Sequence, residues 1–130
     1  MNGFKILVVV CCVVALAYGH LTPEQQEAKL ESQRHCLKET GATEEMVRNA
    51  FKGEISDAPE FKKHLFCVKK SAGIVDDSGN YNKDVLRETV SKYVDDADTV
   101  NSMIEKCFKM MESPEETAYE MTKCFASFKE

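Results

Sequence analysis

The chain has 130 residues and a formal net charge of −5 at pH 7, so its surface is acidic. An acidic surface repels phosphate groups, which argues against nucleic acid and against stable membrane association as partners. No HExxH, G-x-S-x-G or P-loop motif occurs, and the three histidines lack zinc-ligand spacing. The sequence therefore favours a protein that is not an enzyme and that needs no metal or cofactor.

Residues 1–19 are expected to be a secretory signal peptide. A single charge, Lys5, precedes the apolar run 6–16, and Ala17-Tyr18-Gly19 is typical of a cleavage site. The alternative, an N-terminal membrane anchor, is disfavoured because the apolar run is too short to cross a bilayer. We therefore expect a secreted, extracellular protein with one domain at residues 20–130.

Cleavage would change the cysteine count, because Cys11 and Cys12 would leave with the signal. Four of the six cysteines would remain: Cys36, Cys67, Cys107 and Cys124. An even number of cysteines on the secretory route implies two disulfides. The residues alone leave three pairings open.

Two helices are predicted at the start of this domain. Thr22-Pro23-Glu24-Gln25 is a capping box with proline at the first helical position, and it predicts a helix to about residue 39. Gly41 ends that helix. Thr43 caps a short second helix that is expected to run through Phe51.

The stretch 57–73 is predicted to form the central helix. Asp57 is the expected cap, Pro59 lies in the first turn, and Gly73 ends the helix. Apolar residues at i, i+4, i+7 and i+11 form one stripe, which consists of Phe61, Leu65, Val68 and Ala72.

The other faces of this helix carry lysines and a cysteine. The lysines are expected to point away from the apolar stripe: Lys62, Lys63, Lys69 and Lys70. Cys67 lies outside the stripe as well, beside His64 and Ser71. A helix with an apolar stripe and a separate cysteine edge has packing partners on two sides, which suits a central position.

A tight turn at residues 76–79 follows the central helix. It lacks the glycine and the glutamate of a calcium-binding loop, so a helix-linking turn is the better interpretation. Asn82 is then expected to cap a fourth helix through Tyr93 that buries Val85, Leu86 and Val90.

The last two predicted helices have clear patterns. One buries residues spaced i, i+3, i+4, i+7, i+8 and i+11, namely Val100, Met103, Ile104, Cys107, Phe108 and Met111. The other begins at the capping box Ser113-Pro114-Glu115-Glu116 and carries Met121, Cys124, Phe125 and Phe128. Long alternating β-branched runs are absent, so an all-α fold of about six helices is predicted.

The cysteine spacing resembles that of insect odorant-binding proteins of the pheromone-binding and general-odorant-binding family. Cys67 is followed by Gly73 and the acidic turn, as the third of the family's six cysteines is. Lys63 and Glu115 occupy the places of the family's second and fifth cysteines. The chain is therefore similar to the four-cysteine "minus-C" subgroup.

The resemblance implies the disulfides Cys36–Cys67 and Cys107–Cys124. In an ideal antiparallel hairpin, a helix that runs past Cys107 to Met111 would leave the second pair ~8 to 9 Å apart along the helix axes. We therefore expect either a wide crossing angle or an overhanging connection.

The resemblance also suggests that Lys63 and Glu115 form an ion pair in place of the missing disulfide. An exposed ion pair contributes only ~0 to 1 kcal/mol, so the pocket would open more easily. The alternative is that both are solvated surface residues.

The family's fold implies helices around an internal apolar cavity, with Tyr93 or His64 as a polar contact. The residues expected to line it are Phe61, Leu65, Val68, Ile74, Leu86, Val90, Met103, Ile104, Phe108, Met121, Phe125 and Phe128. The implied function is reversible carriage of small hydrophobic molecules such as odorants or pheromones, with an odorant receptor or a weak homodimer as further partners.

Two other functions remain open. The first is a non-olfactory carrier in haemolymph, saliva or reproductive fluid. The second is a secreted interaction protein with a filled core and no ligand.

Overall fold

The computed structural model describes residues 23–92 and 94–127. The expected signal peptide at residues 1–19 and the predicted contacts of Tyr93 and Phe128 lie outside these residues. Within them the chain forms six helices, and the β-type pairing consists of an isolated bridge between Val75 and Tyr81. The predicted all-α fold is confirmed.

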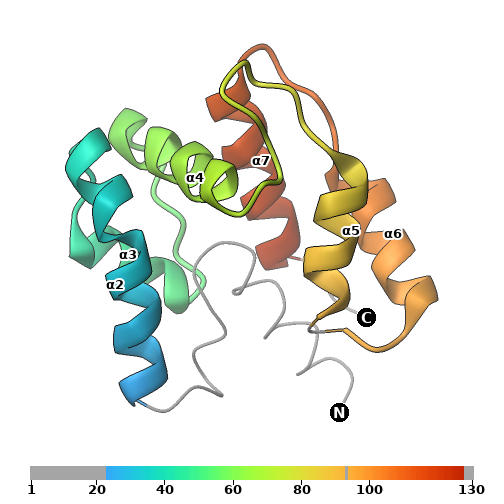
Figure 1. Ribbon diagram of the computed structural model, residues 1–130, viewed down its shortest axis with the longest axis horizontal. Coiled ribbons are helices and arrows are strands. Elements are labelled where there is room, and N and C mark those ends of the chain that lie inside the picture. Colours follow the sequence, from blue (N-terminus) through green and yellow to red (C-terminus); the bar gives the residue numbers. More distant parts are fainter. Residues whose placement is uncertain (1–22, 93, 128–130) are drawn as a thin grey trace.

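The helices form two groups that flank a central pair (Figure 1). Helices α2 and α3 lie on one side, α5 and α6 lie on the other, and α4 and α7 cross between them. The packed pairs include α4 with α2, α4 with α7, and α6 with both α5 and α7. The bounds are α2 Pro23–Thr40, α3 Glu44–Phe51, α4 Pro59–Ser71, α5 Lys83–Ser91, α6 Ala97–Cys107 and α7 Pro114–Ser127.

The predicted helix starts are correct, with one exception. The Thr43 side chain accepts a hydrogen bond from the amide of Met46, and the Asn82 side chain caps α5. The cap of α4 is Ala58 and not Asp57, and it makes no side-chain capping bond. The helix begins one residue later than expected because Pro59, with its fixed φ and missing N–H, takes the first helical position.

Helix α4 packs on two sides, as its sequence predicts. Toward α2, Cys67 is bonded to Cys36 with 5.7 Å between the Cα atoms, and His64 Nε2 lies 2.8 Å from Gln33 Oε1. Toward α7, Lys62 Nζ donates to Glu116 Oε1 at 3.0 Å. The disulfide edge and the edge that faces α7 are different faces of one helix, so α4 joins the two halves of the fold.

The connection between α6 and α7 overhangs, which resolves the expected mismatch at the second disulfide. Helix α6 ends at Cys107 and not near Met111, because Phe108 has an extended backbone. Residues 108–113 then run up beside α7 (Figure 1). At ~3.3 Å per residue they span ~20 Å, which exceeds the ~15 Å along α7 from its first residue to Cys124. Cys107 and Cys124 meet with 5.4 Å between their Cα atoms.

The apolar core has two parts. The N-terminal cluster consists of Leu30, Ala42, Val47, Ala50, Phe61, Leu65, Ala118 and Tyr119. The C-terminal cluster consists of Ile74, Leu86, Val90, Val94, Val100, Met103, Ile104, Cys107, Met121 and Phe125. Helix α7 contributes to both clusters, so it is shared by the two halves of the fold.

Loss of either disulfide is expected to destabilise the fold. The bridges close loops with sequence separations of 31 for Cys36–Cys67 and 17 for Cys107–Cys124. Replacing both cysteines of a pair by alanine should lower the free energy of unfolding by about 3 to 4 kcal/mol in each case. Urea unfolding measures this change, and a loss below about 1 kcal/mol would contradict it.

Candidate functional site

Most residues that the sequence assigns to a ligand pocket meet in the C-terminal cluster. They come from the segment after α4 and from α5, α6 and α7, and their side chains are almost completely buried: Ile74, Leu86, Val90, Met103, Ile104, Met121 and Phe125. Phe108 is half-buried and packs against the cluster. The structure therefore places these residues together around one apolar centre.

The α4 residues of the predicted set lie elsewhere. Phe61 and Leu65 belong to the N-terminal cluster, where their neighbours come from α2, α3 and α7. Val68 is half-buried and belongs to neither cluster. Helical periodicity groups these residues on one face of α4, but the crossing of α4 over α7 decides which part of the core that face meets.

The surface over the described residues has open depressions, and none of the predicted pocket residues lines the two described below. One lies between α2 and α3 and is lined by Glu31, Arg34, His35, Leu37, Lys38, Ala42 and Glu44. Another lies beside α7 and is lined by Gly53, Ile55, Tyr119, Lys123, Ala126 and Ser127. The depression between α2 and α3 is lined mainly by charged side chains, which is unlike the lining of small-molecule sites.

Lys69 corrects an expectation from the sequence. It was expected to point away from the apolar stripe, but its side chain is 1% exposed and Nζ donates to Thr122 Oγ1 of α7 at 2.8 Å. Burial lowers the pKa of Lys69 to about 7. A signal was present in the sequence: Lys69 follows Leu65 by four residues, and so lies at the edge of the stripe.

The four lysines of α4 therefore divide into two pairs. Lys62 and Lys69 share one face and point at α7, where they meet Glu116 and Thr122. Lys63 is exposed, and the Lys70 ammonium lies 3.5 Å from Asp77.

The proposed ion pair between Lys63 and Glu115 is wrong. Among the described residues, the ion pair that links α4 to α7 joins Lys62 to Glu116 at 3.0 Å. Lys62 Nζ also lies 4.6 Å from the centre of the Tyr119 ring. The neighbouring lysine and glutamate pair because a shift of one residue turns a side chain by about 100° around a helix, which moves Lys63 away from α7.

His64 is a second buried titratable group, on the α2 side of α4. Its ring stacks on Phe61, and its Nε2 is hydrogen-bonded to Gln33. Burial lowers the pKa of His64 to about 4, and the nearby Lys69 charge acts in the same direction. His64 is therefore a neutral imidazole at physiological pH.

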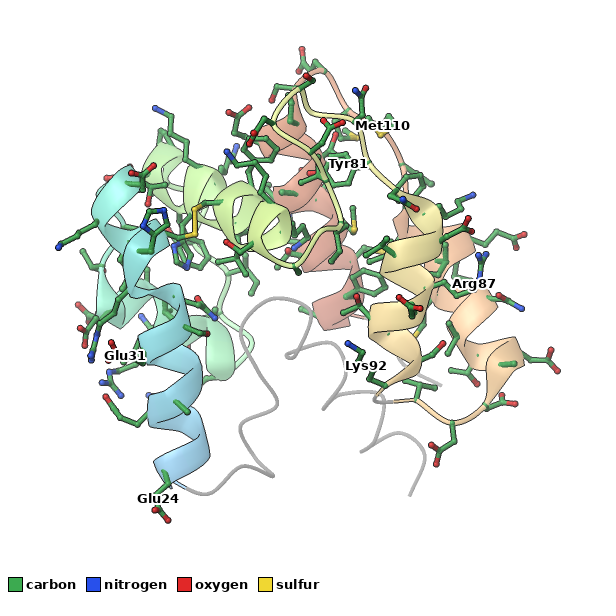
Figure 2. The ribbon with its side chains drawn as sticks, in the orientation of Figure 1. Glu24, Glu31, Tyr81, Arg87, Lys92 and Met110 are labelled. Atoms are coloured by element: carbon green, nitrogen blue, oxygen red, sulfur yellow. A yellow bond between two sulfur atoms is a disulfide. The ribbon has the colours of Figure 1, made fainter. Side chains whose placement is uncertain are left out.

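Tyr81 is partly buried and packs against the C-terminal cluster, in the upper part of the molecule as Figure 2 shows it. Its hydroxyl donates to the carbonyl of Pro114 at 2.8 Å, and its ring meets Phe108 edge-on at 6.2 Å. Burial raises the pKa of Tyr81. Gly79 is needed beside it, because it has a φ of +87° and a Cβ there would lie 2.6 Å from the Pro114 ring.

The turn before α5 has the structure that its sequence predicts. The Asp76 carboxylate accepts hydrogen bonds from the amides of Ser78 and Asn80. A group of three side chains placed to hold a metal ion does not occur among the described residues. Within residues 23–92 and 94–127, none of the helices is both long and apolar enough to cross a membrane.

The chain is similar in sequence to insect proteins. A family model described as "PBP/GOBP family" matches residues 19–127. The B2 protein of Tenebrio molitor is 32% identical over 112 residues, which cover 86% of this chain and 88% of that protein. General odorant-binding protein 19d of Drosophila melanogaster is 30% identical over 115 residues, which cover 85% of this chain and 76% of that protein.

The fold is also similar to a solved structure. The THP12 carrier protein from the yellow meal worm superposes with a TM-score of 0.60 at 27% identity. The match covers 72% of this chain and 86% of that protein. The likeness therefore extends over most of the described helices.

Replacing Lys69 by methionine is expected to stabilise the protein at neutral pH. The pKa of Lys69 is lowered from 10.5 to about 7 on folding, so between these values the unfolded chain holds a proton that the folded chain lacks. The free energy of unfolding should therefore rise by about 2 kcal/mol from pH 7 to pH 9 in the wild type and should not change with pH over this range in Lys69→Met. Urea unfolding across this range tests it, and Lys70→Met should behave as the wild type.

Acid is expected to destabilise the fold through His64. Its pKa falls from 6.5 to about 4 on folding, so between these values the unfolded chain binds a proton that the folded chain does not. The free energy of unfolding therefore keeps its full value above pH 6.5 and decreases as the pH falls toward 4. Thermal unfolding between pH 6.5 and 5 should show a clear drop in Tm for the wild type and for the exposed-site control His35→Gln. An equal drop in His64→Gln would contradict this assignment.

Proposed function

The chain belongs to the PBP/GOBP family, and on that premise we propose that it is a secreted carrier that binds small hydrophobic molecules reversibly and without catalysis. The fold match to a protein named as a carrier and the sequence match to a protein named as a general odorant-binding protein support this function. Odorants, pheromones or similar lipophilic molecules are the proposed ligands.

The observation that carries the proposal is the convergence of large apolar side chains from four parts of the chain. Ile74, Leu86, Met103 and Phe125 come from separate elements and meet in the C-terminal cluster. Met103 and Met121 are both fully buried there, and methionine adapts its shape to irregular apolar partners. This composition supports a site that repacks around a guest.

The proposed mechanism is transfer of the ligand's apolar surface from water into this cluster. Each buried Å² contributes roughly 25 cal/mol, so a ligand that buries about 400 Å² gains on the order of 10 kcal/mol. Lost ligand freedom and the ordering of side chains offset several kcal/mol of that gain. The expected affinity is therefore micromolar, which suits reversible carriage.

Secretion follows from the same proposal. Both disulfides need an oxidising compartment, and residues 1–19 have the sequence features of a signal peptide. Removal of that segment would take Cys11 and Cys12 with it and leave a four-cysteine protein of the minus-C type at residues 20–130. The mass of the secreted protein tests this, since it reports both the cleavage site and the absence of free thiols.

Ligand uptake is tested with the fluorescent probe N-phenyl-1-naphthylamine and two matched leucine variants. Leu86 lies in the C-terminal cluster and Leu30 in the N-terminal cluster, and both are at most 1% exposed. Each change to alanine should lower the free energy of unfolding by about 2 to 5 kcal/mol. Only Leu86→Ala should change the probe's Kd, by about threefold or more, since only that cluster receives the ligand.

The same titration separates the carrier from the other class of protein. A wild-type chain with no saturable probe uptake would have a filled core, and a secreted interaction protein would then be the better assignment. Equal changes in probe Kd for the Leu86 and Leu30 variants would place the ligand outside the C-terminal cluster. Tissue expression distinguishes an olfactory carrier from one in haemolymph, saliva or reproductive fluid.

A further inference from the structure

The buried ammonium of Lys69 lacks an acidic partner. Its side chain is 1% exposed, and the hydrogen bond that the structure gives its Nζ goes to the neutral hydroxyl of Thr122. The ion pairs among residues 23–92 and 94–127 all use other cations, and Glu116 of α7 is paired with Lys62. Buried charges in proteins are normally paired, so an anion would stabilise the ammonium form of this amine.

The position of this amine places it at the boundary of the two core clusters. On α4, Leu65 lies one turn before Lys69 and belongs to the N-terminal cluster, while the Lys69 carbonyl accepts the amide of Ile74, which belongs to the C-terminal cluster. On α7, Thr122 lies between Ala118 of the first cluster and Phe125 of the second. The amine therefore lies at the end of the apolar region that we propose as the ligand site.

We propose that Lys69 and Thr122 form the head-group site for a ligand that is a long-chain carboxylic acid, with its hydrocarbon tail in the C-terminal cluster. This inference rests on the proposed carrier function and names its ligand class. A lysine ammonium has three donors, and the bond to Thr122 uses one of them. The remaining donors and the threonine hydroxyl can hold both oxygens of a carboxylate.

The electrostatics of the site favour an anion over a neutral head group. Burial alone lowers the pKa of Lys69 to about 7, and no neighbouring charge contributes to that shift. A carboxylate at hydrogen-bond distance favours the ammonium form, so binding of the acid would be accompanied by proton uptake. The Lys69 charge also lowers the pKa of His64, the neighbouring titratable group on α4. Because that pKa is about 4, His64 is neutral at the pH of the site and the Lys69 ammonium supplies the charge there.

The test compares two ligands that share one tail and differ in the head group. Dodecanoic acid and 1-dodecanol displace N-phenyl-1-naphthylamine from the full secreted protein at pH ~6.5, where the free carboxyl is ionised and Lys69 is mostly protonated. In Lys69→Met the Kd of the acid should rise about ten- to hundredfold, as expected for loss of a charge-assisted hydrogen bond. The Kd of the alcohol should change by less than about threefold.

Two further variants make the result specific to this amine. Lys69→Gln keeps a polar group near Thr122 without the charge, and the Kd of the acid should rise in this variant as it does in Lys69→Met. Lys70→Met removes a half-exposed lysine from the next position on α4 and should bind both ligands as the wild type does.

The outcomes separate this inference from the carrier function itself. If the Kd values of the acid and the alcohol rise equally in both Lys69 variants, the proposed head-group site is wrong and the carrier function stands. If the wild type takes up neither the probe nor either ligand, the carrier function fails and the head-group site fails with it.

Discussion

The fold depends on one helix being held on opposite faces by two different kinds of interaction. Helix α4 is bonded covalently to α2 through Cys36–Cys67, and it meets α7 through the polar contacts of Lys62 and Lys69. Because α4 crosses between the two outer groups of helices, these contacts set where each half of the core can form (Figure 1). The division into an N-terminal and a C-terminal cluster follows from this crossing.

The two faces differ in the kind of bond that holds them. A disulfide contributes ~2 to 4 kcal/mol and fixes the separation of the backbones, whereas a partly exposed ion pair such as Lys62–Glu116 is screened by solvent and can open and re-form. Among the described residues, α4 and α7 share no disulfide. Their interface is therefore held by non-covalent contacts, and the proposed ligand site lies directly beside it. Opening along this interface would admit a guest without breaking a covalent bond.

The second disulfide shows how a connection can satisfy a covalent constraint. Cys107 is the last residue of α6, and Cys124 lies deep within α7. The extended segment 108–113 supplies the length that separates the two helix ends. It leaves Met110 and Met111 exposed, and Met110 lies near the top of the molecule (Figure 2). Tyr81 and Gly79 pack against Pro114 at the same end, so the start of α7 is held by the turn before α5.

The sequence by itself determined the order of the helices and the two packing faces of α4, because capping residues, glycines and the 3.6-residue period act within a few residues of one another. It also indicated the residues of the C-terminal cluster, which the period places on inward faces. Only the tertiary structure decided that Phe61 and Leu65 join the other cluster, that Lys62 and not Lys63 pairs with α7, and that Lys69 is buried. These outcomes depend on the angle at which α4 crosses α7, and that angle is set by contacts between residues more than fifty positions apart.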